Sequence, residues 1–402
     1  MRALIRAEEK RQRETIDLIA SENFISAGVS ETLGSVFSNK YAEGYPGKRY
    51  YAGTTIVDML ERETQVRALK LFVRQPADRK KWSVNVQPLS GSPANLAIYM
   101  ALVPKGARMM GMRLDAGGHL THGFSGSASG KFWKWVHYGL NPKTERLDYK
   151  EIARTAKKWK PKLIVAGGSA YSPLIEWKKF RSIADSVGAL LMVDMSHLAG
   201  LVAGHAHPSP FPYADVVMTT THKTLRGPRG AMIFSKNEYA KAINRSVFPG
   251  VQGGPHMNQI AGLAVALREA DTGEFRKYAK QVVRNARTFV DELKKQGWRI
   301  VSGGTATHLF SVDTGERGVR GNDAEKLLER AGIIVNREEL PNDKGGSRDP
   351  SGIRIGTPAV TTRGMKERDI KKVARLMSEL LLFPSELTKI KKEISKLAKQ
   401  FS

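Results

Sequence analysis

The sequence predicts an α/β protein with a mainly parallel sheet, followed by a smaller α+β domain. Short apolar runs alternate with longer amphipathic stretches through the middle of the chain, a rhythm typical of parallel strands covered by helices on both faces. After about residue 262 this rhythm gives way to a long helical stretch and shorter strands. The 402 residues are also enough for two or three domains of roughly 150 residues each.

The first 72 residues contain two helical patterns separated by a loop-like segment. Residues 1–20 are predicted to form a charged amphipathic helix, and residues 54–72 return to helical spacing. Residues 21–53 are rich in Gly, Ser, Asn and Tyr, which favours loops. Beyond them, the predicted buried strands are Leu163–Ala166, Leu190–Val193, Val216–Met218 and Ala231–Phe234, with a helix over Trp177–Val187.

The last third of the chain predicts the smaller domain. A long helix is expected from about Gln259 to Gln296, and a further helical run closes the chain. Strands are expected around Arg299–Val301, Leu309–Val312 and Ile333–Val335. The predicted divisions are an N-terminal helix and arm (1–38), a large domain (39–265) and a small C-terminal domain (266–402).

The final helix carries an apolar stripe among lysines. Leu387, Ile390, Ile394, Leu397 and Phe401 recur at helical spacing. Such a helix can lie on a membrane or a partner, or it can pack its stripe on its own domain. The second alternative is favoured, because it describes ordinary surface helices.

Composition excludes several classes of protein. The chain has no cysteine, which rules out disulfides, thiolate catalysis and cysteine-ligated metal sites. Its net charge of +26 permits an anionic partner without establishing one. Because the charged first ten residues hold no uninterrupted apolar stretch and later apolar runs fall far short of the ~20 residues of a membrane span, a cytoplasmic protein without membrane association is expected.

A lysine at the end of a predicted strand is the strongest chemical signal. The run Val216–Gly230 leads from apolar residues into a loop rich in hydroxyls and glycine, which contains Lys223. His222, Arg226 and Arg229 lie close by in sequence, and neighbouring cations lower the pKa of a lysine. A lysine of this kind suits Schiff-base chemistry, although a single loop lysine is by itself ordinary.

An aspartate ends the preceding predicted strand. Asp194 follows Leu190–Val193 at the carboxyl end, where α/β folds place ligands. Pyridoxal phosphate requires an aspartate at its ring nitrogen and a lysine for its aldehyde. Asp194 could also simply cap a helix, so the signal depends on its pairing with Lys223.

Two glycine-containing segments complete the pattern. Ser90–Asn95 places small residues at the start of a helix, where free N–H groups can hold a phosphate. Gly117–Gly123 places His119 and His122 in a flexible loop. Since no third ligand accompanies these histidines, no metal site is predicted.

These residues resemble one family, serine hydroxymethyltransferase, over about residues 8 to 382. The resemblance is a series of motifs in order, of which the thirteen residues 39–51 (Asn-Lys-Tyr-Ala-Glu-Gly-Tyr-Pro-Gly-Lys-Arg-Tyr-Tyr) are the most specific. The others are residues 18–23, 117–123, 169–172, 193–200, 219–230, 248–255 and 351–359. The resemblance implies an aspartate-aminotransferase-like fold and a pyridoxal 5′-phosphate enzyme.

The resemblance also implies roles around the cofactor. Lys223 would form the Schiff base, Asp194 would hold the ring nitrogen protonated, and His119 would stack on the ring. Ser169 and His197 would contact the ring near its phenolic oxygen. The phosphate would be bound by Ser90, Gly91 and Ser92, and by Tyr41, Gly253 and Gly254 of a second subunit.

Other roles concern the substrates. Arg354 would bind the amino-acid carboxylate as a bidentate fork, while Ser21 and Tyr51 would approach the substrate across a dimer interface. Glu43 would carry a proton near the hydroxymethyl group, and His222 and Arg229 would adjust Lys223. The expected reaction interconverts serine and glycine, and a homodimer with shared sites is the expected unit.

The one-carbon acceptor implied by the resemblance is tetrahydrofolate or another reduced pterin. Glu338 and Glu339 stand where bacterial family members tend to carry neutral polar residues, against the pterin. Two carboxylates there can change which pterin binds, so the identity of the pterin stays open.

Two other functions compete with this one. A pyridoxal-phosphate aldolase or transaldolase acting on threonine-like amino acids would share the cofactor, but the intact 39–51 motif favours the transferase. A basic nucleic-acid-binding protein would explain the charge, but no zinc-finger spacing or RNA-binding aromatic motif supports it. No specific nucleic acid is therefore expected as a partner.

Overall fold

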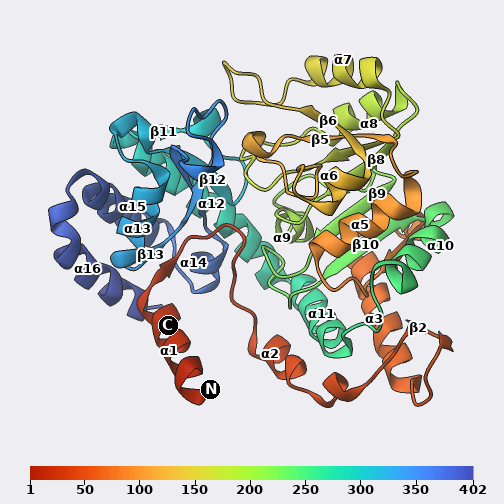
Figure 1. The fold of residues 1–402 in the computed structure, drawn as a ribbon. Coiled ribbons are helices and arrows are strands. Elements are labelled where there is room, and N and C mark those ends of the chain that lie inside the picture. Colours follow the sequence, from red (N-terminus) through yellow and green to blue (C-terminus); the bar gives the residue numbers. More distant parts are fainter. Residues whose placement is uncertain (402) are drawn as a thin grey trace.

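The centre of the molecule is a seven-stranded sheet, seen in a computed structural model that describes residues 1–401 (Figure 1). The strand order is β4-β10-β9-β8-β7-β5-β6, and only β10 runs antiparallel to its neighbours. The strands are β4 (Trp82–Asn85), β5 (Arg108–Met112), β6 (Lys134–Tyr138), β7 (Leu163–Ala166), β8 (Leu190–Asp194), β9 (Val216–Thr220) and β10 (Ala231–Lys236). This confirms the predicted α/β class and all four predicted buried strands.

Alternate residues of the strands pack into two separate cores. Val193 and Val217 face one apolar cluster, while Met192 and Val216 face the other. The first face is covered by α3 (Thr55–Phe72), α7 (Tyr149–Trp159), α8 (Trp177–Asp185), α9 (Ala199–Ala203) and α11 (Met257–Ala270), and the second by α5 (Gly91–Leu102) and α10 (Asn237–Arg245). Burial on both faces explains why the strands read as continuous apolar runs.

The C-terminal part forms a smaller α+β unit. Its antiparallel sheet has the order β11-β12-β15-β14. The strands are β11 (Arg299–Ile300), β12 (Leu309–Asp313), β14 (Asn336–Glu338) and β15 (Gly352–Gly356), and the helices are α13 (Gly321–Arg330), α14 (Pro358–Thr362), α15 (Glu367–Leu382) and α16 (Leu387–Lys399). On α16, Ile390, Ile394 and Leu397 are buried in this unit, which confirms that the stripe packs on its own domain.

The single long helix predicted for residues 259–296 was wrong, because two helices occupy it. α11 ends at Ala270, and α12 (Gly273–Lys295) begins after Thr272, whose hydroxyl accepts a hydrogen bond from Phe275 N. The turn residues Asp271-Thr272-Gly273 could have signalled this break. The predicted domain limits stay predictions; along α12, packing passes from the large core at Val283 to the small one at Phe289.

The prediction of one helix over residues 1–20 was also wrong at its C-terminal end. α1 (Arg2–Glu14) stops at Thr15, and β1 (Ile16–Asp17) pairs with β13 (Ile333–Ile334). Ile16 and Leu18 are fully buried in the small-domain core. Burial of alternate residues is the spacing of a strand, and this long-range pairing overrides the local helical pattern.

The segment predicted as loop, residues 21–53, holds short regular pieces. These are α2 (Ala27–Leu33), a turn of 3₁₀-helix at Val36–Asn39, and the hairpin β2 (Gly44–Tyr45) with β3 (Lys48–Arg49). α2 begins at Ser26, whose hydroxyl accepts a hydrogen bond from Val29 N. Among residues 1–401, no helix is both long and apolar enough to span a bilayer.

The buried N-terminal arm predicts a stability difference between two leucines. Leu18→Ala should remove about 2–5 kcal/mol of stability, because the small-domain core cannot close the cavity that is left. The control Leu382→Ala truncates a leucine of the same domain that is 40% exposed and should have little effect. Thermal unfolding followed by circular dichroism measures both, and equal shifts in melting temperature would contradict the placement of Leu18.

Candidate active site

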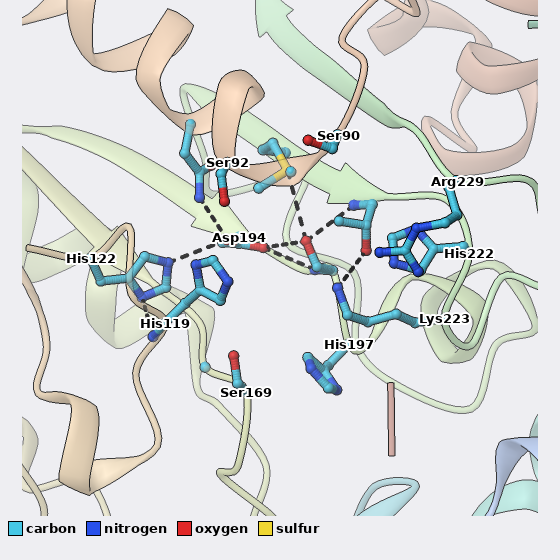
Figure 2. Close-up of a pocket in the computed structure, with 16 residues that line it drawn as sticks. Ser90, Ser92, His119, His122, Ser169, Asp194, His197, His222, Lys223 and Arg229 are labelled. Atoms are coloured by element: carbon cyan, nitrogen blue, oxygen red, sulfur yellow. Dashed lines mark hydrogen bonds and ion pairs between the residues drawn. The ribbon is translucent and has the colours of Figure 1, made fainter. Parts of the chain in front are cut away.

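A cavity of about 210 Å³ lies at the carboxyl edge of the central sheet (Figure 2). Asp194 ends β8, Ser169 follows β7, and Lys223 follows β9. The chain segments after parallel strands converge on this edge, so residues distant in sequence meet there. The predicted residues lining the cavity are Ser90, Gly91, Ser92, His119, Ser169, Asp194, His197, His222, Lys223 and Arg229.

Lys223 lies in this cavity with a fixed side chain and a lowered pKa. Its Nζ donates a hydrogen bond to Thr220 Oγ1 at 2.9 Å. Burial is the largest cause of a fall in its pKa from 10.5 to about 8; Asp194 opposes this fall, and Arg354 and Arg229 contribute to it. An amine with this pKa is partly neutral near physiological pH, as attack on an aldehyde requires.

Asp194 is a buried carboxylate that stays ionised. Its Oδ1 accepts hydrogen bonds from Ser196 Oγ at 2.6 Å and Ser196 N at 3.1 Å, and its Oδ2 accepts from His122 Nε2 at 3.2 Å and Asn95 Nδ2 at 3.1 Å. Burial alone would raise its pKa, but the hydrogen bonds from His122 and Ser196 hold the pKa well below its usual value. A protected negative charge of this kind can hold a proton on a heterocyclic nitrogen.

The sequence reasoning missed these three partners of Asp194. His122 was considered only as a metal ligand, although it stands in the same motif as His119. Ser196 lies two residues after the aspartate, a spacing at which a hydroxyl often bonds back to a carboxylate. Asn95 sits on α5, and nothing in the sequence indicates that it reaches Asp194.

Three histidines around the cavity are kept neutral. Burial lowers the pKa of His119 to about 4 and that of His222 to about 3. Burial, and then the charge of Lys223, hold the pKa of His197 well below its usual range. His197 also stacks on His308 with ring centroids 5.4 Å apart. These rings therefore offer flat faces and hydrogen-bonding nitrogens rather than charge.

The start of α5 forms an anion-binding cradle beside Lys223. Ser90 caps the helix, and its side chain makes no capping hydrogen bond. A Cβ at Gly91 would lie 2.7 Å from Thr220 Cγ2, so only glycine lets the helix approach β9 this closely. Arg229 lines the same cavity, and the buried His222 Nδ1 has no protein partner. Free helix N–H groups, hydroxyls and a guanidinium together fit a phosphate.

Arg354 lies in a second cavity of about 410 Å³, which shares His119, Ser169, His197 and Lys223 with the first and also contains Ser21. Arg354 Nη1 donates to Ser169 O at 2.9 Å, and Nε donates to Asn336 Oδ1 at 3.1 Å. Glu338 Oε2 lies 4.0 Å from the same Nε. Burial raises the pKa of Glu338, against the effect of Arg354. The guanidinium of Arg354 is thus oriented by hydrogen bonds within the chain. Asn336 is a partner that the sequence did not indicate.

The remaining predicted residues lie outside both cavities and form a separate group. Tyr41 and Tyr51 have ring centroids 4.9 Å apart, and Tyr41 OH donates to Glu43 Oε1 at 3.5 Å. A Cβ at Gly253 would lie 3.1 Å from Glu43 Oε1, and one at Gly254 would lie 3.2 Å from the Tyr41 ring. The predicted site is therefore divided into two groups within one chain.

Comparisons with known proteins agree with this geometry. The family model described as "Serine hydroxymethyltransferase" matches residues 1–377. A protein of that name from Coprothermobacter proteolyticus is 51% identical over 399 residues, covering 99% of this chain and 94% of its own length. Another from Desulfotalea psychrophila is 52% identical over 379 residues, covering 94% and 87%.

The lowered pKa of Lys223 predicts how cofactor capture depends on pH. The neutral, reactive fraction of the amine grows as pH rises through its pKa, so the rate at which Lys223 reacts with an added aldehyde such as pyridoxal phosphate should have its midpoint near pH 8 and level off above it. Stopped-flow absorbance measures this rate, with free lysine as the control for the cofactor's own titration. Arg354→Gln should move the curve to higher pH, because a neighbouring cation is removed. A wild-type rate that climbs as it does for free lysine would contradict the prediction.

Proposed function

This chain belongs to the serine hydroxymethyltransferase family and interconverts serine and glycine, and we propose that it does so with pyridoxal 5′-phosphate held at Lys223. The observation that carries the proposal is that a lysine of lowered pKa, an ionised buried aspartate and a phosphate cradle line one cavity. These three groups match the aldehyde, the ring nitrogen and the phosphate of that cofactor.

When bound, the cofactor withdraws electrons from the amino acid's Cα so that the bond to the side chain can break. The protein's part is to position the cofactor and the substrate and to balance their charges. Asp194 would keep the ring nitrogen protonated, the start of α5 would hold the phosphate, and neutral His119 would offer its face to the ring. Ser169 and His197 would contact the ring oxygen, while His222 and Arg229 would adjust the proton affinity of Lys223.

Arg354 binds the carboxylate of the amino-acid substrate. Its Nη1 and Nε are engaged by Ser169 O and Asn336 Oδ1, so the fork is set before the substrate arrives. Ser21 lines the same cavity and can bond to the substrate. The carboxylate would thereby be fixed on one side of Lys223, which leaves the hydroxymethyl group to face Glu43 of a second copy of this chain, the proposed proton carrier.

The second cavity accommodates a reduced pterin, tetrahydrofolate or a relative, as the one-carbon acceptor. Besides Arg354 it is lined by Leu114 and Leu120, which offer apolar contact, and by Glu338 and Glu339. Carboxylates of raised pKa can accept or share hydrogen bonds with a pterin's ring N–H groups. Every ligand named here is small and water-soluble, which suits an enzyme of the cytoplasm.

A homodimer would bring the two groups of site residues together. Two tyrosines, Tyr41 and Tyr51, are about half exposed and, like Glu43, Gly253 and Gly254, line neither cavity of their own chain. Apolar side chains on the adjoining helix α3 are also exposed: Ile56 at 63%, Met59 at 62% and Val66 at 60%. An isologous interface over this surface would cover them and supply the missing residues to the partner's cavity.

Substitution of Lys223 tests the proposed chemistry. The wild-type protein loaded with pyridoxal phosphate should be yellow and should cleave serine faster when a reduced pterin is added. Lys223→Ala should lose the bound-cofactor absorbance and more than about 10³-fold of the activity, because the attachment point is gone. The surface variant Lys326→Ala is the control. A colourless wild-type protein, or one that cleaves threonine readily with no pterin stimulation, would sink the proposal in favour of another function.

Mixed dimers test the shared site. Lys223→Ala and Glu43→Gln chains should each be inactive, but a heterodimer of the two contains one intact site. An equal mixture, unfolded and refolded together, should therefore recover about a quarter of the wild-type activity. If each chain builds its own site, the mixtures remain inactive, which would contradict the shared site.

A further inference from the structure

Eight exposed cations gather at the amino edge of the central sheet, the edge opposite the active site. We name this set the amino-edge patch: Lys105, Arg108, Lys131, Lys134, Lys157, Lys158, Lys160 and Lys162. They precede or begin strands β5, β6 and β7, or end helix α7, which lies along the upper side of the molecule in Figure 1.

Backbone pairing forces several of these charges together. Arg108 and Lys134 are direct partners across β5 and β6, and Lys162 N donates to Arg108 O at 2.8 Å. Gly106 N donates to Phe132 O at 2.9 Å, which joins the turns that carry Lys105 and Lys131. Like charges on neighbouring strands repel each other, so the fold carries this repulsion unless an anion offsets it.

The protein supplies no such anion nearby. Residues 103–114, 128–144 and 152–175 contain neither aspartate nor glutamate. The acids on the adjacent helices are matched to other cations, Glu151 to Arg154 and Glu176 to Lys179. The C-terminal dipole of α7 favours Lys157, Lys158 and Lys160, but the cations at the strand starts have no comparable partner among residues 1–401.

Lys160 occupies a backbone conformation that favours glycine. It caps α7 with φ 43° and ψ 62°, in the left-handed region. Glycine takes this position in many helices because a Cβ is disfavoured there. A strained lysine in the middle of a basic patch points to a use for its charge.

Two exposed aromatic rings lie among the cations. Trp159 is 41% exposed, with Lys158 Nζ 5.5 Å from its ring centroid. Phe132 is 45% exposed, with Lys105 Nζ 5.9 Å from its centroid. Rings and ammonium groups side by side match the alternation of bases and phosphates in a single strand of nucleic acid.

We propose that the amino-edge patch binds single-stranded RNA without sequence specificity. Phosphates would neutralise the strand-start cations, and bases would stack on Trp159 and Phe132. An anionic membrane fits less well, because the exposed apolar groups of the patch are two isolated rings and the adjoining Val103 and Trp133 are buried. Since the active site lies at the other edge of the sheet and β2 lies at the opposite side of the molecule (Figure 1), bound RNA leaves both the cavity and the proposed dimer surface open.

Two triple variants of equal charge test the proposal. The patch variant carries Lys134→Gln, Lys160→Gln and Lys162→Gln, and the control carries Lys391→Gln, Lys392→Gln and Lys396→Gln on the exposed face of α16. Fluorescence anisotropy with labelled oligouridylate gives the dissociation constant at several salt concentrations. The slope of log affinity against log salt should fall by about 2 in the patch variant, at about 0.7 per lost phosphate contact, and stay unchanged in the control. Equal losses in both variants would mean that net charge alone binds RNA, and would overturn the proposal.

Two further measurements separate stacking and folding from charge. Trp159→Ala should weaken binding to oligouridylate about tenfold and leave binding to duplex RNA unchanged, because only unpaired bases can stack on the ring. Lys160→Gly should weaken RNA binding while keeping or raising the melting temperature, because glycine relieves the left-handed backbone. Serine cleavage should stay at the wild-type rate in all these variants. Retention on phosphatidylserine vesicles without retention on RNA would also overturn the proposal.

Discussion

The buried charge of Asp194 is the constraint on which the site depends. A carboxylate 8% exposed is costly to keep ionised unless hydrogen bonds replace its water. Those hydrogen bonds come from three separate segments: Asn95 on α5, His122 in the loop after β5, and Ser196 just beyond β8. Satisfying one carboxylate therefore fixes the start of α5 and the histidine loop against the end of β8. The same α5 begins with the proposed phosphate cradle, so the positions proposed for the ring nitrogen and for the phosphate depend on one network.

Burial then acts differently on each titratable group around that network. Two histidines of the cavity are kept neutral, since burial lowers the pKa of His119 to about 4 and that of His222 to about 3. Lys223 starts from a higher value and falls only to about 8, because Asp194 partly offsets the burial and the two arginines. One low-dielectric pocket thus yields neutral rings, a reactive amine and a lasting carboxylate. Burial in one pocket, together with the neighbouring charges, is enough to set the protonation state of each of these groups.

The sequence predicted the parts of this arrangement that are local. Lys223 and Asp194 stand at strand ends in short motifs, and the strands are apolar on both faces, so their position at the carboxyl edge followed from pattern alone. Asn95 and Asn336 could not be predicted, because their roles arise from contacts between segments distant in the chain. The prediction of a helix through the N-terminal arm was wrong for the same reason. Leu18 fits the local helical pattern, and only its hydrogen bond beside β13, to a segment distant in the chain, shows that it is extended. Family resemblance named Glu43 and its neighbours, but one chain's geometry leaves them apart from Lys223.

The two edges of the parallel sheet also differ in how their positive charges are paired with carboxylates. At the carboxyl edge, where the cavity lies, two of the cations have a nearby carboxylate: Arg354 faces Glu338, and Asp194 acts on Lys223. At the amino edge the strand-start cations of the patch have no ion-pair partner among residues 1–401, although Arg108 and Lys134 are held side by side by the same hydrogen-bond ladder. An excess of +26 spread evenly would let each charge turn toward solvent. Residues 131–181 instead hold thirteen basic and four acidic side chains, +9 of the +26, and Lys134 and Lys162 among them lie at or just before the starts of β6 and β7. The repulsion among these cations lies at the edge opposite the active site. The RNA that we propose as a ligand of the amino-edge patch would offset it.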